Sequence, residues 1–336
     1  MKKLKRIFAV FFCLLLAAGI LGGCGKAASS SAPAPSALQS GNKPLKIVTT
    51  IFPEYDWVRE ILGDKADHAE VTMLLDNGVD LHSYQPTADD IIKISDCDLF
   101  LYVGGESDGW VEDALKEATN QNMKVINLLD VLGEQVKEEE VVEGMEAEEE
   151  ESEDEDEPEY DEHVWLSLKN AETLCSAITD ALEEIDPANK DAYATNAASY
   201  LEKLAALDGE YQTVVDNAAR KTVLFGDRFP FRYLVDDYGL SYYAAFAGCS
   251  AETEASFETI SFLAGKVDEL GLPCVLTIEG AQHKIAETIV QNTAEKNPSI
   301  LTLDSMQSTT STDVANGTTY LSVMESNLDV LKQALN

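Results

Sequence analysis

The chain has 336 residues, with 61 Asp and Glu side chains against 24 Lys and Arg, which gives a formal net charge of −37. Binding of nucleic acid depends on basic side chains that neutralise phosphates, so this balance excludes nucleic acid as a partner. Residues 138–162 alone hold 17 of the acidic side chains, so part of the charge is local. The region from residue 45 onward, about 290 residues, is long enough for two domains and a large core without disulfides.

The N-terminal segment indicates export. Basic residues at positions 2, 3, 5 and 6 precede an apolar run from Ile7 to Leu21, which is short for a membrane span and typical of a secretory signal peptide. The run closes on Leu-Gly-Gly-Cys24, which resembles the lipobox of bacterial lipoproteins. We therefore predict a signal peptide over 1–24, acylation of Cys24, and anchoring at the outer face of the bacterial cytoplasmic membrane, because two acyl chains give stable attachment.

Residues 25–44 are rich in Ser, Ala, Pro and Gly, a composition that predicts a flexible tether. The N-terminal lobe is predicted over 45–165, where strand-like and helix-like patterns alternate. This alternation favours a mostly parallel sheet with helices on both faces. The expected strands are 45–51, 69–75, 99–103 and 124–128, and the expected helices are 55–62, 88–94 and 110–118.

The acidic block over 138–162 interrupts this pattern. Its carboxylates repel one another and it has few apolar side chains, so we predict a disordered loop. Two roles stay open for it. Carboxylates bind divalent cations loosely, so the loop could collect cations at the mouth of a site; the alternative is a solubilising insert without a role in transport.

Connecting helices are predicted over 166–220, where helical periodicity covers 166–185 and 188–219 with Asp-Pro between them. The second helix would span about 45 Å at 1.5 Å per residue, enough to join two lobes. A second α/β lobe is expected over 221–336. Its expected strands are 222–225, 242–246, 274–278 and 300–303, and its expected helices are 229–237, 257–270, 281–293 and 318–335.

Four polar side chains follow predicted strands, and ligand sites in open α/β sheets form at strand ends. They are His82 and His163 in the first half of the chain and Asp227 and Glu279 in the second. Neutral imidazoles with a nearby carboxylate suit zinc and its neighbours among the transition metals. The sequence therefore predicts a metal site between the lobes.

Two of these positions lie in longer motifs. Val79–Asp89 contains Asp-x-His-x-Tyr-x-Pro, and Asp161–Ala171 reads Asp-Glu-His-Val-Trp-Leu-Ser-Leu-Lys-Asn-Ala. Both resemble signatures of the zinc and manganese solute-binding proteins of ABC importers, the cluster A-I or zinc-uptake family. The resemblance implies two (β/α)4-like lobes joined by one rigid helix, with metal held in the cleft by three histidines and a carboxylate. It implies that His82, His163 and Glu279 are three of these ligands.

The family's third histidine is missing, because Gly226 stands at its position after the first strand of the second lobe. Asp227, a water, or His283 remain as alternatives for this ligand. We favour His283 because an imidazole restores the nitrogen count, whereas Arg228 offers Asp227 a charge partner. His283 also follows Glu279 by four residues, a spacing that one helical turn would bring to one face.

Other polar residues are assigned lesser roles. Asp161 or Glu162 could hold the His163 ring and fix its tautomer, and His68 is expected at the surface. Among the cysteines, Cys97 and Cys175 lie in or beside helical patterns and are expected to be packed thiols. Cys249 and Cys274 could form a disulfide in an oxidising compartment.

The sequence thus predicts a monomeric, lipid-anchored receptor that captures zinc, with manganese as the alternative, and passes it to an ABC permease without catalysis. A secreted metallohydrolase is one alternative, but the chain lacks His-Glu-x-x-His. A surface adhesin in which the metal is structural is the other, and no sequence patch supports adhesion.

Overall fold

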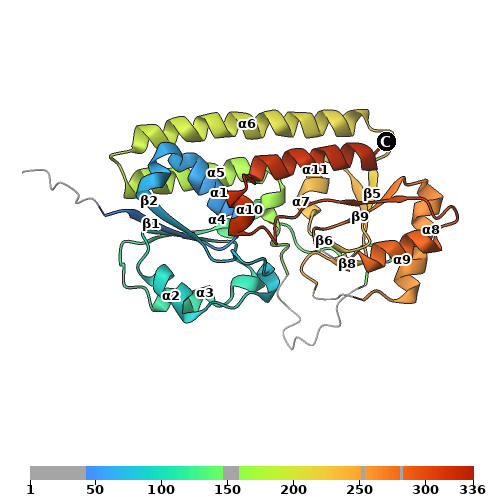
Figure 1. Cartoon of the computed structure of the whole chain (residues 1–336), viewed down its shortest axis with the longest axis horizontal. Helices are drawn as coiled ribbons and strands as arrows, with labels where there is room; N and C mark the ends of the chain where they lie inside the picture. The colour runs from blue at the N-terminus through green and yellow to red at the C-terminus, as the bar shows by residue number, and fades with distance from the viewer. Residues whose placement is uncertain (1–42, 147–158, 251–253, 281–282) are drawn as a thin grey trace, which may run out of the picture. The chain divides into compact units, whose positions relative to one another are not determined.

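The computed structural model describes residues 43–146, 159–250, 254–280 and 283–336, and Pro44–Asn336 forms one compact unit (Figure 1). The predicted signal peptide, Cys24 and nearly all of the tether lie outside the described residues, as does the centre of the acidic block. Among the helices described, none is both long and apolar enough to cross a membrane.

The first lobe is built on a four-stranded parallel sheet in the order β2-β1-β3-β4. Most residues of its two central strands are buried because helices cover both faces, as parallel sheets require. The strands and helices expected from the sequence are confirmed, and α4 is an addition. The strands are β1 (Leu45–Thr49), β2 (Ala69–Met73), β3 (Leu99–Tyr102) and β4 (Lys124–Asn127); the helices are α1 (Phe52–Leu62), α2 (Ala88–Ser95), α3 (Val111–Lys116) and α4 (Leu128–Leu132).

The second lobe repeats this strand order. β5 (Thr222–Leu224) pairs with β7 (Ser241–Tyr243), β9 (Cys274–Thr277) pairs with β10 (Ser299–Thr302), and a bridge between Phe225 and Leu276 joins the two pairs. The resulting order is β7-β5-β9-β10. When the four strands of each main sheet are numbered along the chain, both sheets have the order 2-1-3-4. The helices of this part of the chain are α7 (Arg232–Tyr238), α8 (Phe257–Leu270), α9 (Lys284–Asn292), α10 (Ser311–Ala315) and α11 (Tyr320–Ala334).

The single strand predicted over 242–246 is wrong, because this stretch forms two short strands. β7 stays in the main sheet, whereas β8 (Phe246–Ala247) pairs with β6 (Arg228–Phe229), a strand that the sequence did not reveal. The helix expected from residue 229 starts later, at Arg232. Pro230 explains this delay, because it holds the preceding residue extended and has no N–H to donate.

Two helices link the lobes along one side of the molecule. α5 (Leu168–Ile185) and α6 (Lys190–Asn217) pack together, and α6 also contacts α1, α7 and α11. α6 has 28 residues and spans about 42 Å, which confirms the predicted connector. It buries one stripe at helical spacing: Tyr193, Ala197, Tyr200, Leu204, Leu207, Tyr211 and Val215.

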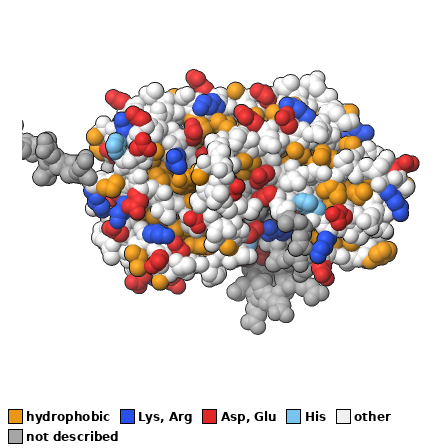
Figure 2. Space-filling view, in the orientation of Figure 1, with side chains coloured by type: hydrophobic (Ala, Val, Ile, Leu, Met, Phe, Trp, Pro, Cys, Tyr) orange, Lys and Arg blue, Asp and Glu red, His pale blue; other side chains and the backbone are white. Residues whose placement is uncertain are grey.

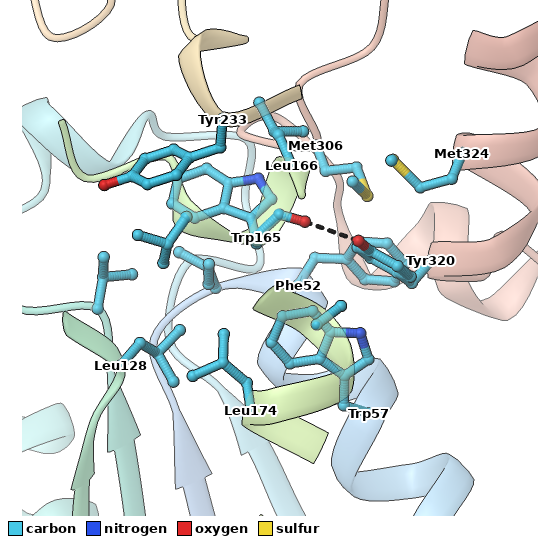
Figure 3. Packing of buried hydrophobic residues seen from close by; sticks show 14 of the residues in the cluster. Phe52, Trp57, Leu128, Trp165, Leu166, Leu174, Tyr233, Met306, Tyr320 and Met324 are labelled. Carbon is cyan, nitrogen blue, oxygen red and sulfur yellow. Dashed lines mark hydrogen bonds between the residues drawn. The ribbon is translucent and has the colours of Figure 1, made fainter. Parts of the chain in front are cut away.

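Buried aromatic residues fasten the turn that carries His163 (Figure 3). The Tyr320 hydroxyl donates to the Trp165 carbonyl at 2.7 Å, and the Trp165 indole donates to the Ser305 carbonyl at 2.8 Å. The Tyr233 hydroxyl donates to the Asp161 carbonyl at 2.8 Å. The turn is therefore held by residues of both α7 and the C-terminal segment.

The ends of the acidic block are ordered, contrary to the predicted disordered loop over 138–162. Glu138 bridges Tyr160, and Glu146 bridges Phe246 of β8 with its N–H donating to the Ala245 carbonyl at 3.0 Å. Pairing of the backbone and burial of Met145 outweigh charge repulsion here. On the face in Figure 2, acidic side chains are spread over the surface rather than gathered in one patch.

The four cysteines described are free thiols, so the possible disulfide between Cys249 and Cys274 does not form. Cys97 and Cys175 are fully buried, which confirms them as packed thiols. Cys274 is buried in β9, whereas Cys249 is partly exposed on the turn after β8. The two residues belong to different parts of the second lobe.

Candidate metal centre

His82 and His163 meet although 81 residues separate them. Their Nε2 atoms lie 3.2 Å apart and their ring centroids 5.1 Å apart. His82 lies in a short 3-10 turn over Leu81–Ser83, and His163 immediately precedes another over Val164–Leu166. A tetrahedral zinc with Zn–N bonds of about 2.0–2.1 Å separates two nitrogen ligands by roughly 3.3 Å. The pair therefore has the spacing of two imidazoles on one zinc ion.

His163 is completely buried, and a carboxylate fixes its orientation. Oδ1 of Asp161 lies 2.9 Å from the ring Nδ1 and accepts the backbone N–H of His163 at 2.8 Å. This contact favours the tautomer with the proton on Nδ1, which leaves a lone pair on Nε2. Burial alone lowers the pKa of His163, but the Asp161 carboxylate outweighs it and the net pKa is raised.

His82 is held by a different set of groups. Its Nδ1 lies 2.8 Å from the Ser107 hydroxyl and 3.5 Å from Glu162 Oε2, and Asp80 accepts its backbone N–H at 3.0 Å. Burial, followed by the neighbouring His163, lowers the pKa of His82 to about 3. The ring is therefore neutral at physiological pH, as a metal ligand must be. Asp161 and Glu162 were the two acids expected to hold the His163 ring. Only Asp161 contacts this ring, whereas Glu162 lies beside the ring of His82.

Cys249 is the third member of this group, and sequence analysis did not assign it to the site. One ligand atom from each of His82, His163 and Cys249 lies within 4.8 Å of the others, and no further such group occurs among the described residues. Burial, followed by the Glu139 charge, raises the pKa of the thiol well above its usual range. A cysteine within Gly-Cys-Ser matches no metal motif, so only its polar turn context could have pointed to the site.

Glu279 follows β9 as expected but is already engaged. Its carboxylate accepts the N–H and hydroxyl of Ser305 at 2.6 and 2.8 Å and the N–H groups of Gln307 and Ser308 at 2.9 and 3.4 Å. These bonds order the turn after β10. Glu279 is not in the group formed by the two histidines and Cys249, and to ligate a metal it would have to exchange some of these bonds.

His283 and Asp227 do not join that group either. α9 begins at Lys284 with His283 as its N-cap, so Glu279 and His283 do not share a helical turn and the spacing argument fails. His283 Nδ1 is buried, with no hydrogen-bond partner among the described residues. Asp227 accepts the backbone N–H groups of Arg228 and Ile278 at 2.9 and 3.3 Å.

The Arg228 guanidinium contacts Asp80 rather than Asp227, at 2.6 Å, and donates to the Ser250 carbonyl at 3.3 Å. It thereby connects the His82 turn to the turn that carries Cys249. Gly226 packs directly against α9, where an added Cβ would lie 2.6 Å from the Cα of Ala286. Position 226 therefore has no side chain that could bind a metal, and the packing of α9 leaves no room for one.

Two lobes with the same parallel strand order, a long connecting helix and a buried pair of imidazoles define a two-lobed metal-type solute-binding protein. Residues 47–334 match the model of the family described as zinc-uptake complex component A, periplasmic, and the chain belongs to this family. The family consists of exported transport components rather than enzymes. The metallohydrolase and adhesin alternatives are not favoured by the comparisons below.

Relatives and solved structures agree with this assignment. The chain is 33% identical over 290 residues to the zinc-binding lipoprotein AdcA of Streptococcus pneumoniae, covering 86% of this chain and 55% of AdcA. It therefore spans about half the length of the first relatives that it matches. It is 32% identical over 337 residues to the high-affinity zinc uptake system protein ZnuA of Bacillus subtilis, covering 99% and 98% of the two chains.

A solved structure, the Zn(II)-bound ZnuA-like domain of AdcA from Streptococcus pneumoniae, superposes with a TM-score of 0.67 at 30% identity. The match covers 87% of this chain and 99% of that domain. It supports the fold of two lobes with a long connecting helix.

Proposed function

We propose that this protein captures Zn²⁺ outside the cytoplasmic membrane and delivers it to an ABC permease, without catalysing a reaction. The observation that carries the proposal is the pair of Nε2 atoms 3.2 Å apart, with each ring held at Nδ1 by an oxygen. Zinc is favoured over manganese because manganese prefers oxygen ligands. The names of the relatives, which include a zinc-binding lipoprotein and a zinc uptake protein, support the same cargo.

In this proposal His82 and His163 supply two nitrogens and Glu279 supplies the carboxylate once it leaves part of its present bonding. For the ligand missing at Gly226, the sequence alone predicts His283, or Asp227 in its place, whereas Cys249 is the residue that lies beside the two imidazoles. The mature chain acts as a monomer attached by lipid at Cys24, with 25–44 as tether, 45–165 and 221–336 as lobes, and 166–220 as the connector.

Isothermal titration of the metal-stripped full chain with zinc and with manganese tests the function. We expect one zinc to bind per chain, more tightly than manganese. A native chain that binds no stoichiometric zinc would overturn the proposal. Titration of Glu279→Ala and His283→Ala, beside the exposed His68→Ala as control, tests the remaining ligand predictions, since each true ligand should weaken zinc binding when removed.

A further inference from the structure

The turn over Ala247–Ser250 lies directly on the histidine pair. Gly248 packs so closely against His163 that an added Cβ would lie 3.0 Å from ring Cε1 and 2.9 Å from the Phe229 carbonyl. Only a residue without a side chain lets the backbone approach the ring at this distance. The next residue, Cys249, is thereby brought to the edge of the two imidazoles.

The second half of this turn is tied to neighbouring elements. The N–H of Cys249 donates to Glu139 Oε1 at 3.0 Å. The Ser250 carbonyl accepts from Arg228, which in turn pairs with Asp80 beside His82. Groups from both lobes therefore hold the backbone on either side of the thiol.

The spacing suits a metal ion. A tetrahedral zinc with Zn–S and Zn–N bonds of about 2.3 and 2.05 Å places sulfur roughly 3.6 Å from each nitrogen. The three ligand atoms lie within 4.8 Å of one another, so rotation about the single side-chain torsion of cysteine and small movements of the turn suffice to close the set.

We propose that Cys249 is the third ligand of this centre, bound as a thiolate, and that it takes the place left by the histidine missing at Gly226. This inference rests on the proposed function. On binding, the S–H bond breaks, the proton passes to water, and the sulfur electron pair forms the bond to the metal, whose charge stabilises the thiolate. A His₂Cys set with a further oxygen selects zinc-like cations and disfavours manganese.

Cobalt(II) substitution tests the proposal directly, because a thiolate ligand gives Co²⁺ an intense near-ultraviolet charge-transfer band that imidazole and carboxylate do not. The full chain carries Cys13→Ser and Cys24→Ser throughout, so that the N-terminal thiols do not contribute. We expect the band in this chain and in Cys274→Ser, a buried thiol away from the histidines, and its loss in Cys249→Ser. Absence of the band in the parent chain, or its persistence in Cys249→Ser, would overturn the proposal.

Zinc competition against a chelator supplies the second measurement. Because loss of groups outside the ligand set already costs about 10–100-fold, Cys249→Ser should weaken zinc binding by about 100-fold or more. Cys249→His should recover most of this loss, and Cys274→Ser should change little. Equal affinity of Cys249→Ser and parent would contradict the proposal, and the parent-chain cobalt spectrum decides even if a variant fails to fold.

The two proposals fail separately. A parent chain that binds one zinc tightly but gives no thiolate band removes Cys249 from the site and leaves the zinc receptor intact. A parent chain that binds no zinc overturns the receptor itself.

Discussion

In the first lobe, each imidazole of the candidate metal centre is held at Nδ1 by an oxygen, from Asp161 or Ser107, and the two Nε2 atoms lie 3.2 Å apart. In the second lobe, the candidate ligands lie at the ends of short elements, and one of them, Glu279, is bonded to other residues. The difference teaches that hydrogen bonds within the first lobe fix the two imidazoles, whereas the other proposed ligands come from the second lobe.

The largest effect is expected from removing one of the two paired histidines. His163→Ala should weaken zinc binding by roughly 1,000-fold or more, because it deletes a buried ligand whose geometry is already correct. His68→Ala, at an exposed histidine, should bind zinc like the native chain in the same calorimetric titration. If both variants bound zinc equally, the metal would lie elsewhere in the molecule.

The contact between Asp161 and the His163 ring can be weakened without removing the ring. Asp161→Asn keeps an oxygen that can accept the backbone N–H of His163 but loses the charge that orients the imidazole. We expect zinc affinity to fall by about 10–100-fold. Asp329→Asn, at an exposed ion pair with Lys332, is the control, and a loss no larger than in this control would show that the carboxylate is dispensable.

Gly226→His tests whether the second lobe has room for the histidine that the family carries at this position. Gly226→His should destabilise the fold by about 1–3 kcal/mol, because its Cβ meets the backbone of Ala286. Gly226→Ala should show most of the same loss, since the clash begins at Cβ. Urea unfolding of both variants measures this. If Gly226→His bound zinc more tightly and was as stable as the native chain, this result would show that α9 moves to make room for the new side chain.

The smallest effect concerns Glu54, a buried acid of α1 in the first lobe. Burial, followed by the charge of Asp108, raises the pKa of Glu54 to about 8, against 4.5 for an unperturbed group. The folded state therefore keeps a proton that the unfolded chain loses, and stability falls as pH rises through this window. Between pH 6 and 8 we expect Glu54→Gln to remove on the order of 1 kcal/mol of this fall.

Urea unfolding at the two pH values measures the effect, with the exposed Glu112→Gln as control. If native and Glu54→Gln chains lost the same stability, the Glu54 proton would not be linked to folding.

The alternation of strands and helices and the long connector could be predicted because their hydrophobic periods are local. β6 and β8 could not, because two-residue strands have no period and form only through pairing with each other. The histidine pair followed from motif context and strand ends. Cys249 did not, because its approach depends on the close packing of Gly248 on His163, a contact across 85 residues of sequence.

The His283 argument from spacing failed for a related reason. The helix begins one residue after His283, so a four-residue separation from Glu279 does not correspond to one turn. Likewise, sequence proximity suggested that Arg228 would pair with Asp227, whereas the fold brings Asp80 to it from the other lobe. Contacts between the lobes were the part of the site that local patterns could not supply.

Zinc X-ray absorption of the native full chain, loaded with one equivalent, tests the central claim most directly. We predict two imidazole nitrogens at about 2.0–2.1 Å and the Cys249 sulfur at about 2.3 Å. These imidazole signals should disappear when His82 and His163 are both replaced by alanine. A native spectrum without imidazole scattering would contradict the account.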